Sequence, residues 1–345
     1  MQDFYKNKKV LITGSSGFVG SWLTMTLHQM GASLFGISLE PNTSPSLFKL
    51  LNLEEKINQK YIDICDYQNL AKALNEISPD IVFHLAAQPL VRESYIKTIE
   101  TFNTNVIGTL NVLESCKVLG TNVNFVCITT DKCYENNEFG ERFVESDPLG
   151  GKDPYSASKA CTEIVTKSHA MSFNNLKICT ARAGNIIGGG DWAKDRIITD
   201  IVESITQNKN IVIRNPKAIR PWQHVIDVIN GYLKLAIYND EKEEVFNSFN
   251  FGPLEKNEIN VETLTKKFIS NWSSCNSSII LDKNENLPES NILRLNSDKA
   301  KEILNWEPIM DIDSTINETA QWYENFYSEK EIYEYTNDQI KKYLN

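Results

Sequence analysis

A tyrosine and a lysine stand four residues apart in the segment DPYSASKACTEIV, at positions 155 and 159. On a helix this spacing places both side chains on one face. A lysine one turn away favours the phenolate through its charge, so we expect Lys159 to lower the pKa of Tyr155 and make it a general base. The spacing alone is also common on solvated helices, so other motifs must support this interpretation.

A second group of reactive side chains lies in FVCITTDKCYEN, residues 125–136, where an apolar, β-branched run ends in two threonines, an aspartate and a lysine. The carboxyl ends of buried parallel strands are where such sheets bind ligands. We expect Thr130 to share the hydrogen bond of a substrate hydroxyl beside Tyr155. The structural alternative is that Asp131 caps the following turn while Lys132 points to solvent.

The elements that must position these residues alternate along the first half of the chain. Strands separated by helices indicate right-handed crossover units and a parallel sheet. The sequence therefore predicts an α/β fold, a Rossmann-type doubly wound parallel sheet. Strand-like runs lie at 9–14, 33–39, 60–66, 80–87, 123–130 and 176–188, with helical patterns at 20–31, 67–77 and 99–119.

The pattern changes after about residue 185, where short strand-like pieces lie among loops. We expect a Rossmann domain over 1–184 plus about 225–250. A smaller α/β substrate-binding lobe, interleaved with it, is expected over about 185–224 and 251–345. The charged segment 328–345 is expected to pack loosely or fray.

The turn TGSSGFVGSWL places Gly14, Gly17 and Gly20 between the first strand and the first helix. Glycines here allow a tight turn, close approach of the backbone to a pyrophosphate, and close packing of helix on sheet. The following helix would offer free N–H groups to phosphates, with Phe18 and Val19 in its first turn. The spacing is G-x-x-G-x-x-G, and its strand–turn–helix context predicts dinucleotide binding.

The nature of the dinucleotide follows from the second strand, which ends at Ser38 with Glu40 as the nearest carboxylate. No arginine follows to neutralise a 2′-phosphate, so NAD is favoured over NADP. Asp63 and Ile64 are expected near the adenine end of the cofactor. Ala86, Ala87 and Gln88, after the fourth strand, are expected alongside the cofactor, although tight packing alone would also explain the two alanines.

Composition excludes several other classes of protein. The chain of 345 residues has a formal net charge of −10, which disfavours a nucleic-acid footprint. Apolar runs fall short of the ~20 residues that span a bilayer. Seven cysteines form no C-x-x-C pair, and His28, His84 and His169 have no metal-ligand spacing. We therefore expect a cytoplasmic protein that binds no metal, nucleic acid or membrane.

Longer motifs extend the glycine turn and the Tyr–Lys pair into a resemblance over residues 13 to 308. With them the chain resembles an extended short-chain dehydrogenase/reductase, and within that group a nucleotide-sugar 4,6-dehydratase. The segments that carry the resemblance are TGSSGFVGSW, PSLF, FHLAAQPLVRESY, TNVIGT, TTDKCYEN, DPLGGKDPYSASKACTE, GNIIGGGDWAKDRI, RPWQHV and KAKEILNWEP.

The resemblance implies a reaction cycle in which a sugar is oxidised at C4 by NAD, loses water across C5–C6, and regains the hydride at C6. Related dehydratases place Asp–Glu or Glu after the threonines, whereas the branch acting on CDP-glucose resembles this chain in placing Asp–Lys. Asp131 would then act as general acid on the C6 hydroxyl and Lys132 as the base at C5. A CDP-hexose is the favoured substrate, in the synthesis of deoxysugar precursors of O-antigen polysaccharide.

The resemblance also assigns residues to the substrate. Asn185 would contact the diphosphate region, Arg196 the nucleotide pocket, and Arg220 the diphosphate, whose oxygens match guanidinium geometry. Trp222 would wall the pocket, or belong to the core, and His224 is more consistent with a structural role. Two helices of this group, at about 99–118 and 156–171, commonly pair into a dimer interface, so a homodimer is expected.

Three alternatives stay open at the level of sequence. Near residue 289 the family tends to carry His–Glu, whereas this chain has Pro288 before Glu289, so another nucleotide sugar such as a nucleotide-linked heptose is the second candidate. A 4-epimerase or ketoreductase of the same fold would release no water. A dinucleotide-binding regulator without chemistry is disfavoured, because Tyr155 and Lys159 are both present.

Overall fold

The computed structural model describes residues 1–120, 122–242, 244–282 and 290–344. Its centre is a seven-stranded sheet in the order β11-β6-β5-β4-β1-β2-β3, in which every pair of neighbours is parallel. This confirms the predicted doubly wound fold. The strands are β1 (Lys9–Thr13), β2 (Ser33–Ser38), β3 (Asn58–Tyr61), β4 (Ile81–His84), β5 (Val123–Ile128), β6 (Leu176–Ala183) and β11 (Phe246–Phe251).

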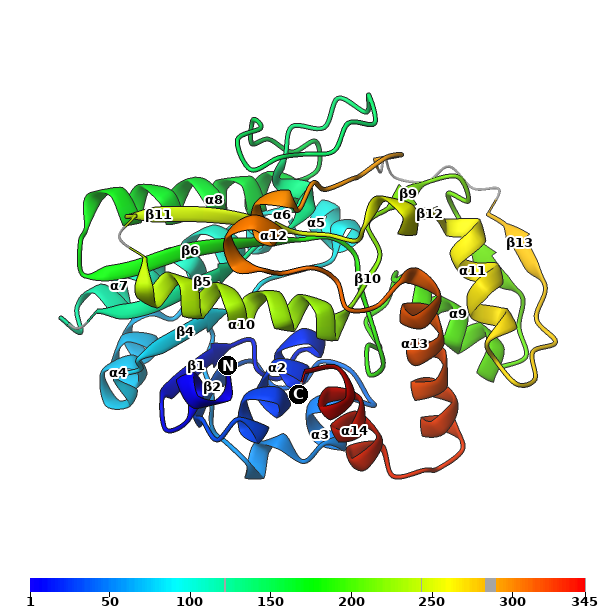
Figure 1. Cartoon of the computed structure of the whole chain (residues 1–345), viewed down its shortest axis with the longest axis horizontal. Helices are drawn as coiled ribbons and strands as arrows, with labels where there is room; N and C mark the ends of the chain where they lie inside the picture. Colours follow the sequence, from blue (N-terminus) through cyan, green and yellow to red (C-terminus); the bar gives the residue numbers. More distant parts are fainter. Residues whose placement is uncertain (121, 243, 283–289, 345) are drawn as a thin grey trace.

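Helices cover both faces of the sheet, and the strands are accordingly apolar on both sides. Within β1, Val10 and Ile12 belong to one core cluster, whereas Leu11 belongs to the other. The first face carries α2 (Phe18–Gln29) and α10 (Val225–Glu241), which crosses the front of Figure 1, and the second face carries α4 (Tyr67–Ile77), α7 (Thr109–Lys117) and α8 (Pro154–Ser172).

The strand order reverses between β1 and β4, which lie side by side in the middle of the sheet. The connections that leave β1 and β4 at this point run to opposite sides, and open α/β sheets bind ligands in the crevice that results. The glycine turn after β1, the alanines after β4 and the Thr–Asp–Lys loop after β5 therefore meet at one edge. They do so although the first and the last of them lie more than 100 residues apart in the chain.

The helix predicted at 99–119 is interrupted. It consists of α6 (Thr98–Phe102), a π-helical turn at Asn103–Gly108, and α7, and it follows the short α5 (Val91–Ile96). Asn105 in the π turn is buried and its amide donates to Ser158 Oγ on α8 at 2.8 Å. Through this contact the side chain of Asn105 faces α8.

A second lobe is built from short paired strands and helices at the right of Figure 1. The paired strands are β7 (Ile186–Ile187) with β10 (Gln223–His224), β9 (Ile219–Arg220) with β12 (Ile259–Asn260), and β8 (Ile211–Ile213) with β13 (Ile279–Leu281). The predicted division of the chain into two domains stays a prediction, since one apolar cluster runs from β1 into this lobe. The helices of the lobe are α9 (Ile197–Thr206), α11 (Val261–Ser270) and α13 (Ile312–Tyr327), whereas α12 (Asp298–Leu304) packs on α10 and β11. Helices α1 (Gln2–Tyr5) and α3 (Leu47–Leu50) belong to the first half.

The expectation that the C-terminal segment packs loosely is wrong. Helix α14 (Ile332–Leu344) buries Ile332 and Ile340 against α10 and α13. Glu318 of α13 also accepts hydrogen bonds from Lys342 at 2.6 Å and Tyr343 at 2.7 Å. The charged residues that suggested a frayed end therefore include partners for a buried carboxylate. No described helix is long and apolar enough to cross a membrane.

Candidate active site

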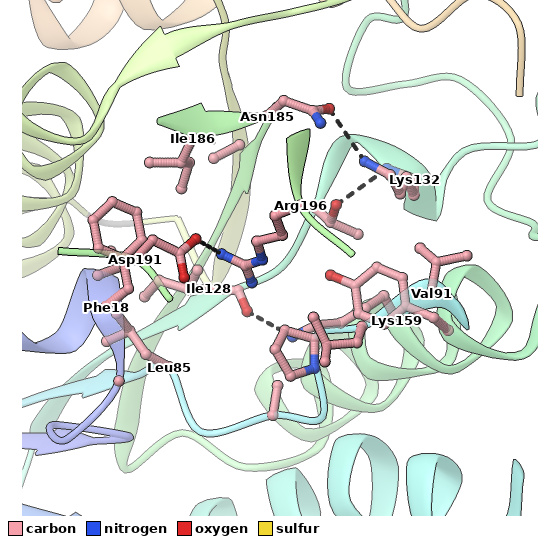
Figure 2. Close-up of a pocket in the computed structure, with 18 of the residues that line it drawn as sticks. Phe18, Leu85, Val91, Ile128, Lys132, Lys159, Asn185, Ile186, Asp191 and Arg196 are labelled. Atoms are coloured by element: carbon pink, nitrogen blue, oxygen red, sulfur yellow. Dashed lines mark hydrogen bonds and ion pairs between the residues drawn. The ribbon is translucent and has the colours of Figure 1, made fainter. Parts of the chain in front are cut away.

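A continuous cavity of about 700 Å³ runs along the carboxyl edge of the sheet and into the second lobe (Figure 2). It brings together nearly every residue that the sequence predicted for a site. Neither Gln88 nor Asp131 lines it, as far as the described residues define its wall. The predicted residues in the lining are Gly14, Gly17, Phe18, Val19, Gly20, Asp63, Ile64, Ala86, Ala87, Thr130, Lys132, Tyr155, Lys159, Asn185, Arg196, Arg220 and Trp222.

The glycine turn fits a dinucleotide phosphate. Gly14 has φ +74°, and a Cβ added there would lie 2.8 Å from the backbone nitrogen of Ala86. A Cβ at Gly20 would lie 2.1 Å from the carbonyl oxygen of Gly14. Helix α2 begins with Gly17 as its N-cap, and no side chain caps its first turn. The first N–H groups of α2 therefore face the cavity with the positive end of the helix dipole, as an anion requires.

The adenosine end of the cavity is lined by Ser38, Leu39 and Glu40 after β2 and by Asp63 and Ile64 after β3. Ser38 Oγ accepts a hydrogen bond from the Gln59 amide at 3.0 Å. Glu40 is exposed at this end of the cavity. The arginines of the lining come from α5 and from the lobe rather than from this end. This arrangement fits the ribose of NAD better than a 2′-phosphate.

Tyr155 stands at the start of α8, where its side chain is 8% exposed and lines the cavity. Its backbone N–H donates to Ser94 Oγ at 3.1 Å, which anchors α8 to α5. Burial raises the pKa of Tyr155, and the Asp131 carboxylate adds to that rise, while the Thr130 hydroxyl and Arg196 act in the opposite direction. The expectation that Lys159 lowers this pKa is therefore wrong for the structure described, because desolvation dominates.

Lys159 lies one helical turn after Tyr155 and is 6% exposed. Its ammonium donates to the carbonyl oxygen of Ile128, at the end of β5, at 3.1 Å (Figure 2). Burial lowers the pKa of Lys159, and Cys127, Glu163 and Cys133 oppose that shift. The lysine is thus held at the strand end, on the cavity wall beside Tyr155.

The Thr–Asp–Lys segment forms a 3-10 turn, Asp131–Cys133, immediately after β5. Thr130, not Asp131, caps this turn, because its hydroxyl accepts from the Lys132 backbone nitrogen at 3.4 Å. Asp131 is completely buried, and its Oδ1 accepts from the Thr130 hydroxyl at 2.9 Å and the Lys132 ammonium at 3.0 Å. The other oxygen, Oδ2, is buried and makes no hydrogen bond with the described residues.

Lys132 does not point away into solvent, because its side chain is 21% exposed and lines the cavity. Its ammonium lies 3.4 Å from Asn185 Oδ1, across the cavity on the connection between β6 and β7 (Figure 2). The structural alternative from sequence therefore does not describe this loop. Lys132 therefore contacts both the Asp131 carboxylate, which does not line the cavity, and the Asn185 amide, which does.

Gln88 has a different environment from the one expected. Its side-chain amide donates to Thr101 Oγ1 at 2.8 Å, and its Oε1 accepts from the Leu90 backbone at 2.5 Å. Its backbone N–H donates to Asn105 Oδ1 at 2.8 Å. The structure thus uses Gln88 to shape the loop after β4, whereas Ala86 and Ala87 line the cavity.

The lobe end of the cavity carries the predicted substrate residues. Arg196 pairs with Asp191 through Nη1 and Oδ2 at 2.6 Å, as Figure 2 shows. Arg220 is 7% exposed and donates to the carbonyl oxygen of Ile219 at 3.0 Å. Trp222 both lines the cavity and belongs to the main apolar core.

His224 has the structural role that its sequence context favoured. Its Nδ1 accepts from the Ile226 N–H at 3.3 Å and caps α10. Burial lowers the pKa of this imidazole to about 4, so it stays neutral. In the described part of the chain, no group of His, Cys, Asp or Glu side chains is arranged to hold a metal ion. Pro288 and Glu289 lie outside the described residues.

Three further ionic residues of the lining escaped the sequence interpretation. Asp195 Oδ1 lies 2.8 Å from Arg214 Nη1 and 3.7 Å from Arg92 Nε. Arg92 comes from α5 of the first half, whereas Arg214 follows β8 in the lobe, so Asp195 links the two sides of the cavity. The arginine in NIVIRN was visible in the sequence, but nothing local indicated that it would meet an arginine from residue 92.

This geometry defines the class of protein, and the comparisons with known proteins agree. The chain belongs to the GDP-mannose 4,6 dehydratase family, whose model matches residues 11–319. It is 41% identical over 332 residues to the CDP-glucose 4,6-dehydratase of Salmonella typhimurium, an alignment that covers 93% of this chain and 92% of that protein.

Solved structures share the fold. A UDP-glucose 4-epimerase of Thermotoga maritima with UDP-glucose matches with a TM-score of 0.82 and 23% identity, covering 92% of this chain and 99% of that one. A dTDP-glucose 4,6-dehydratase of Bacillus anthracis in complex with NAD matches with a TM-score of 0.78 and 22% identity, covering 93% and 98%. Epimerases and dehydratases therefore share this architecture, and the chemistry depends on the residues of the cavity.

Proposed function

We propose that this protein is an NAD-dependent CDP-glucose 4,6-dehydratase, which converts CDP-D-glucose to CDP-4-keto-6-deoxy-D-glucose. The observation that carries the proposal is the position of Lys132 on the cavity wall, bound to Asp131, in the same cavity as Tyr155 and Lys159. An epimerase or reductase needs only the tyrosine, the lysine and a hydroxyl. The additional acid–base pair supplies what the loss of water requires. The 41% identity to a CDP-glucose 4,6-dehydratase supports the same substrate.

The cofactor would be held by the N-terminus of α2 at its pyrophosphate, by Glu40 and Ser38 at a ribose, and by Asp63 and Ile64 near the adenine. When bound, NAD supplies the oxidant for C4 of the sugar and the reductant for C6. Ala86 and Ala87 leave room beside it because their side chains are small. Lys159 would orient the nicotinamide ribose from the end of β5, where its ammonium is already held.

The residues of the chain would handle three protons. Tyr155 Oη takes the proton of the C4 hydroxyl, with the Thr130 hydroxyl sharing that hydrogen bond. Lys132 Nζ takes the C5 proton, which the neighbouring ketone has made acidic. Asp131 is the proton source for the departing C6 hydroxyl.

In the structure Asp131 Oδ1 accepts from the Thr130 hydroxyl at 2.9 Å and from Lys132 Nζ at 3.0 Å, so Lys132 would first pass a proton to this carboxylate. That transfer leaves a neutral amine as the base and a neutral carboxyl as the acid. Because Asp131 does not line the cavity, its proton would reach the C6 hydroxyl through the Thr130 hydroxyl. The proton on Tyr155 would then return to Asp131, and the proton on Lys132 would return to C5 as C6 is reduced.

The nucleotide would occupy the lobe end of the cavity. Arg220 and Arg196 would bind the diphosphate, since a guanidinium fork matches phosphate oxygens. Arg214 and Arg92 extend this positive region, and Asn185 contacts the substrate beside Lys132. Trp222 would form the wall. Asp191 pairs with Arg196, and Asp195 pairs with Arg214, so these two carboxylates hold two of the arginines in place.

The decisive experiment is incubation of the purified protein with NAD and a panel of CDP-, dTDP-, UDP- and GDP-linked sugars, including a nucleotide-linked heptose. Mass spectrometry should find the loss of one water from CDP-glucose, without net consumption of NAD. Deuterium placed at C4 should be recovered at C6 of the product. Interconversion of 4-epimers with no loss of water would instead identify an epimerase. Dehydration of another sugar alone would correct the substrate.

We also infer that the protein is a cytoplasmic homodimer. Large apolar side chains are exposed on the helices predicted to pair: Ile99 is 79% exposed, Ile107 47%, Ile164 56% and Met171 65%. A second copy would cover them. Light scattering at micromolar concentration should give twice the mass of one chain, and Ile164→Asp should give monomers. All seven cysteines are free, which suits a reducing compartment.

A further inference from the structure

An ion pair between Glu163 of α8 and Arg182 of β6 lies beneath the active-site loop and outside the cavity lining. Glu163 Oε2 and Arg182 Nη2 are 2.8 Å apart, and the side chains are 1% and 4% exposed. Burying two charges costs desolvation energy that their attraction does not reliably return, so such a pair is weak evidence for stability. Its contacts with the loop indicate another role.

The carboxylate holds the beginning of the loop. The Thr129 hydroxyl donates to Glu163 Oε1, and the Thr129 backbone N–H donates to the carbonyl oxygen of Ala181 at 2.8 Å. Thr129 is the residue directly before Thr130. Its main chain and side chain are therefore both bound before the chain enters the Thr–Asp–Lys turn.

The guanidinium holds the end of the loop. Arg182 Nη1 donates to the Tyr134 hydroxyl at 2.9 Å, and the guanidinium carbon lies 5.0 Å from the centre of the Tyr134 ring. That hydroxyl donates in turn to Asn250 Oδ1 on β11 at 2.7 Å. Tyr134 is 1% exposed and directly follows the turn.

We propose that the Glu163–Arg182 pair clamps the loop at both ends, and that this clamp sets where Asp131 and Lys132 stand relative to C5 and C6 of the sugar. Only four residues, Thr130 to Cys133, separate the anchored positions Thr129 and Tyr134. Glu163 and Arg182 are thus positioning residues for the elimination step. The inference rests on the proposed dehydratase function.

Tyr155 and Lys159 are held by other contacts, because their anchors are Ser94 on α5 and the carbonyl oxygen of Ile128 on β5. Loosening the clamp should therefore slow the elimination and spare the oxidation at C4. Substituting Glu163 itself would mix two effects, because burial lowers the pKa of Lys159 and the Glu163 carboxylate opposes that shift. Variants of the two threonines that donate to Glu163 can separate the effect on the loop from the effect on the Lys159 pKa.

The test compares Thr129→Val with Thr180→Val. Both threonines donate to the same carboxylate, but Thr180 does so from β6, at 2.9 Å, and has no bond to the loop. Two reactions are measured with NAD present: dehydration of CDP-glucose, and oxidation of CDP-6-deoxyglucose, which has no C6 hydroxyl to lose and reports the first step alone through reduced nicotinamide absorbance.

Thr129→Val should lower kcat for dehydration by roughly 10- to 100-fold, the scale of a misplacement of about 1 Å, and leave KM and the oxidation within about threefold. Thr180→Val should leave both reactions within about threefold. If Thr129→Val does not fold, Tyr134→Phe removes the other anchor and should separate the two reactions in the same way.

Equal losses in the two threonine variants, or equal losses of oxidation and dehydration in Thr129→Val, would overturn the clamp and leave a purely structural ion pair. Unchanged dehydration in Thr129→Val and Tyr134→Phe would also overturn it. A wild-type protein that releases no water from any nucleotide sugar would refute the proposed function instead, so the two failures are distinguishable.

Discussion

The two ends of the cavity present positive charge by different means. At the glycine turn the groups that face a phosphate are backbone N–H groups at the start of α2, and the side chains there are small or apolar. At the lobe end the positive groups are arginine side chains, of which Arg196 and Arg214 pair with Asp191 and Asp195. A backbone site depends on one local turn. A side-chain site is assembled from distant segments and can be changed one residue at a time, as a family with many nucleotide sugars requires.

Between these ends lies the reaction centre, and the largest effect is expected there. Tyr155→Phe removes the hydroxyl that we propose takes the C4 proton, so turnover of CDP-glucose should fall by about 10³-fold, within the usual range for a general base. NAD affinity and thermal stability should stay near wild type. Measurement of kcat by product formation, beside a thermal melt, checks this; turnover within tenfold of wild type would assign the base elsewhere.

Lys132→Ala sharpens the division within that centre. Loss of the amino group would remove the proposed base for C5, so dehydration should fall by roughly 100-fold or more. Oxidation of CDP-6-deoxyglucose should remain within a few-fold, because Tyr155 and Lys159 are untouched. Rapid measurement of reduced nicotinamide follows the oxidation, and normal dehydration by the variant would exclude the role given to Lys132.

The contrast between the two ends is tested directly by Arg214→Gln and Gly17→Ala. Arg214→Gln removes one charge-assisted contact with the nucleotide sugar, so it should raise KM for CDP-glucose about tenfold or more and leave the Kd for NAD unchanged.

A Cβ at Gly17 would lie 3.3 Å from the Gly14 carbonyl oxygen, so the chain should fold while approach to the pyrophosphate is hindered. That variant should therefore weaken NAD and not the nucleotide sugar. Isothermal titration with NAD and with the nucleotide sugar gives the two dissociation constants. A loss of affinity for both ligands in either variant would contradict the comparison.

The smallest effect concerns pH. Burial raises the pKa of Asp200 to about 6; Arg214 opposes the rise, and Asp195 and Glu203 add to it. A raised carboxyl pKa means that Asp200 is neutral below this value and charged above it. Above pH 6 the carboxylate, 3.5 Å from Arg214, competes with substrate for that guanidinium. KM for CDP-glucose should rise about twofold between pH 5.5 and 7.

Asp200→Asn provides the control, because the amide keeps the shape and has no charge to titrate. Its KM should not vary over the same interval, while the affinity for NAD should be independent of pH in both proteins. A wild-type KM that is flat across pH 6 would show that Asp200 does not compete for Arg214.

Much of the fold was predictable because its signals are local. The run KVLIT is apolar at three of the four positions that β1 buries, and α4 occupies the predicted span from Tyr67 to Ile77. The helix around Asn105 was only partly predicted, since the π turn depends on a hydrogen bond to Ser158 that no local pattern reveals. The packing of α14 was missed for the same reason, because its partners lie on α10 and α13.

In the site, too, features set by local sequence were predictable and features set by tertiary contacts were not. Spacing of four on a helix was sufficient to bring Tyr155 and Lys159 to the same cavity, and the strand–turn–helix pattern was sufficient to predict that the glycines line it at the start of α2. The environment of Asp131 was not predictable, because its complete burial depends on the surrounding packing. The pKa of Tyr155 was also misjudged, since desolvation is a property of the packed cavity rather than of the helix.

By itself the sequence determined the sheet, the glycine turn and the Tyr–Lys face, because each follows from covalent spacing and from the period of a helix or strand. Only the tertiary structure decided that Arg92 meets Arg214 through Asp195, that Gln88 turns away from the cavity, and that Glu163 and Arg182 hold the loop. These contacts join segments whose separation along the chain carries no information about their distance in space. They form only when burial of the apolar cores brings the strand ends and the lobe together.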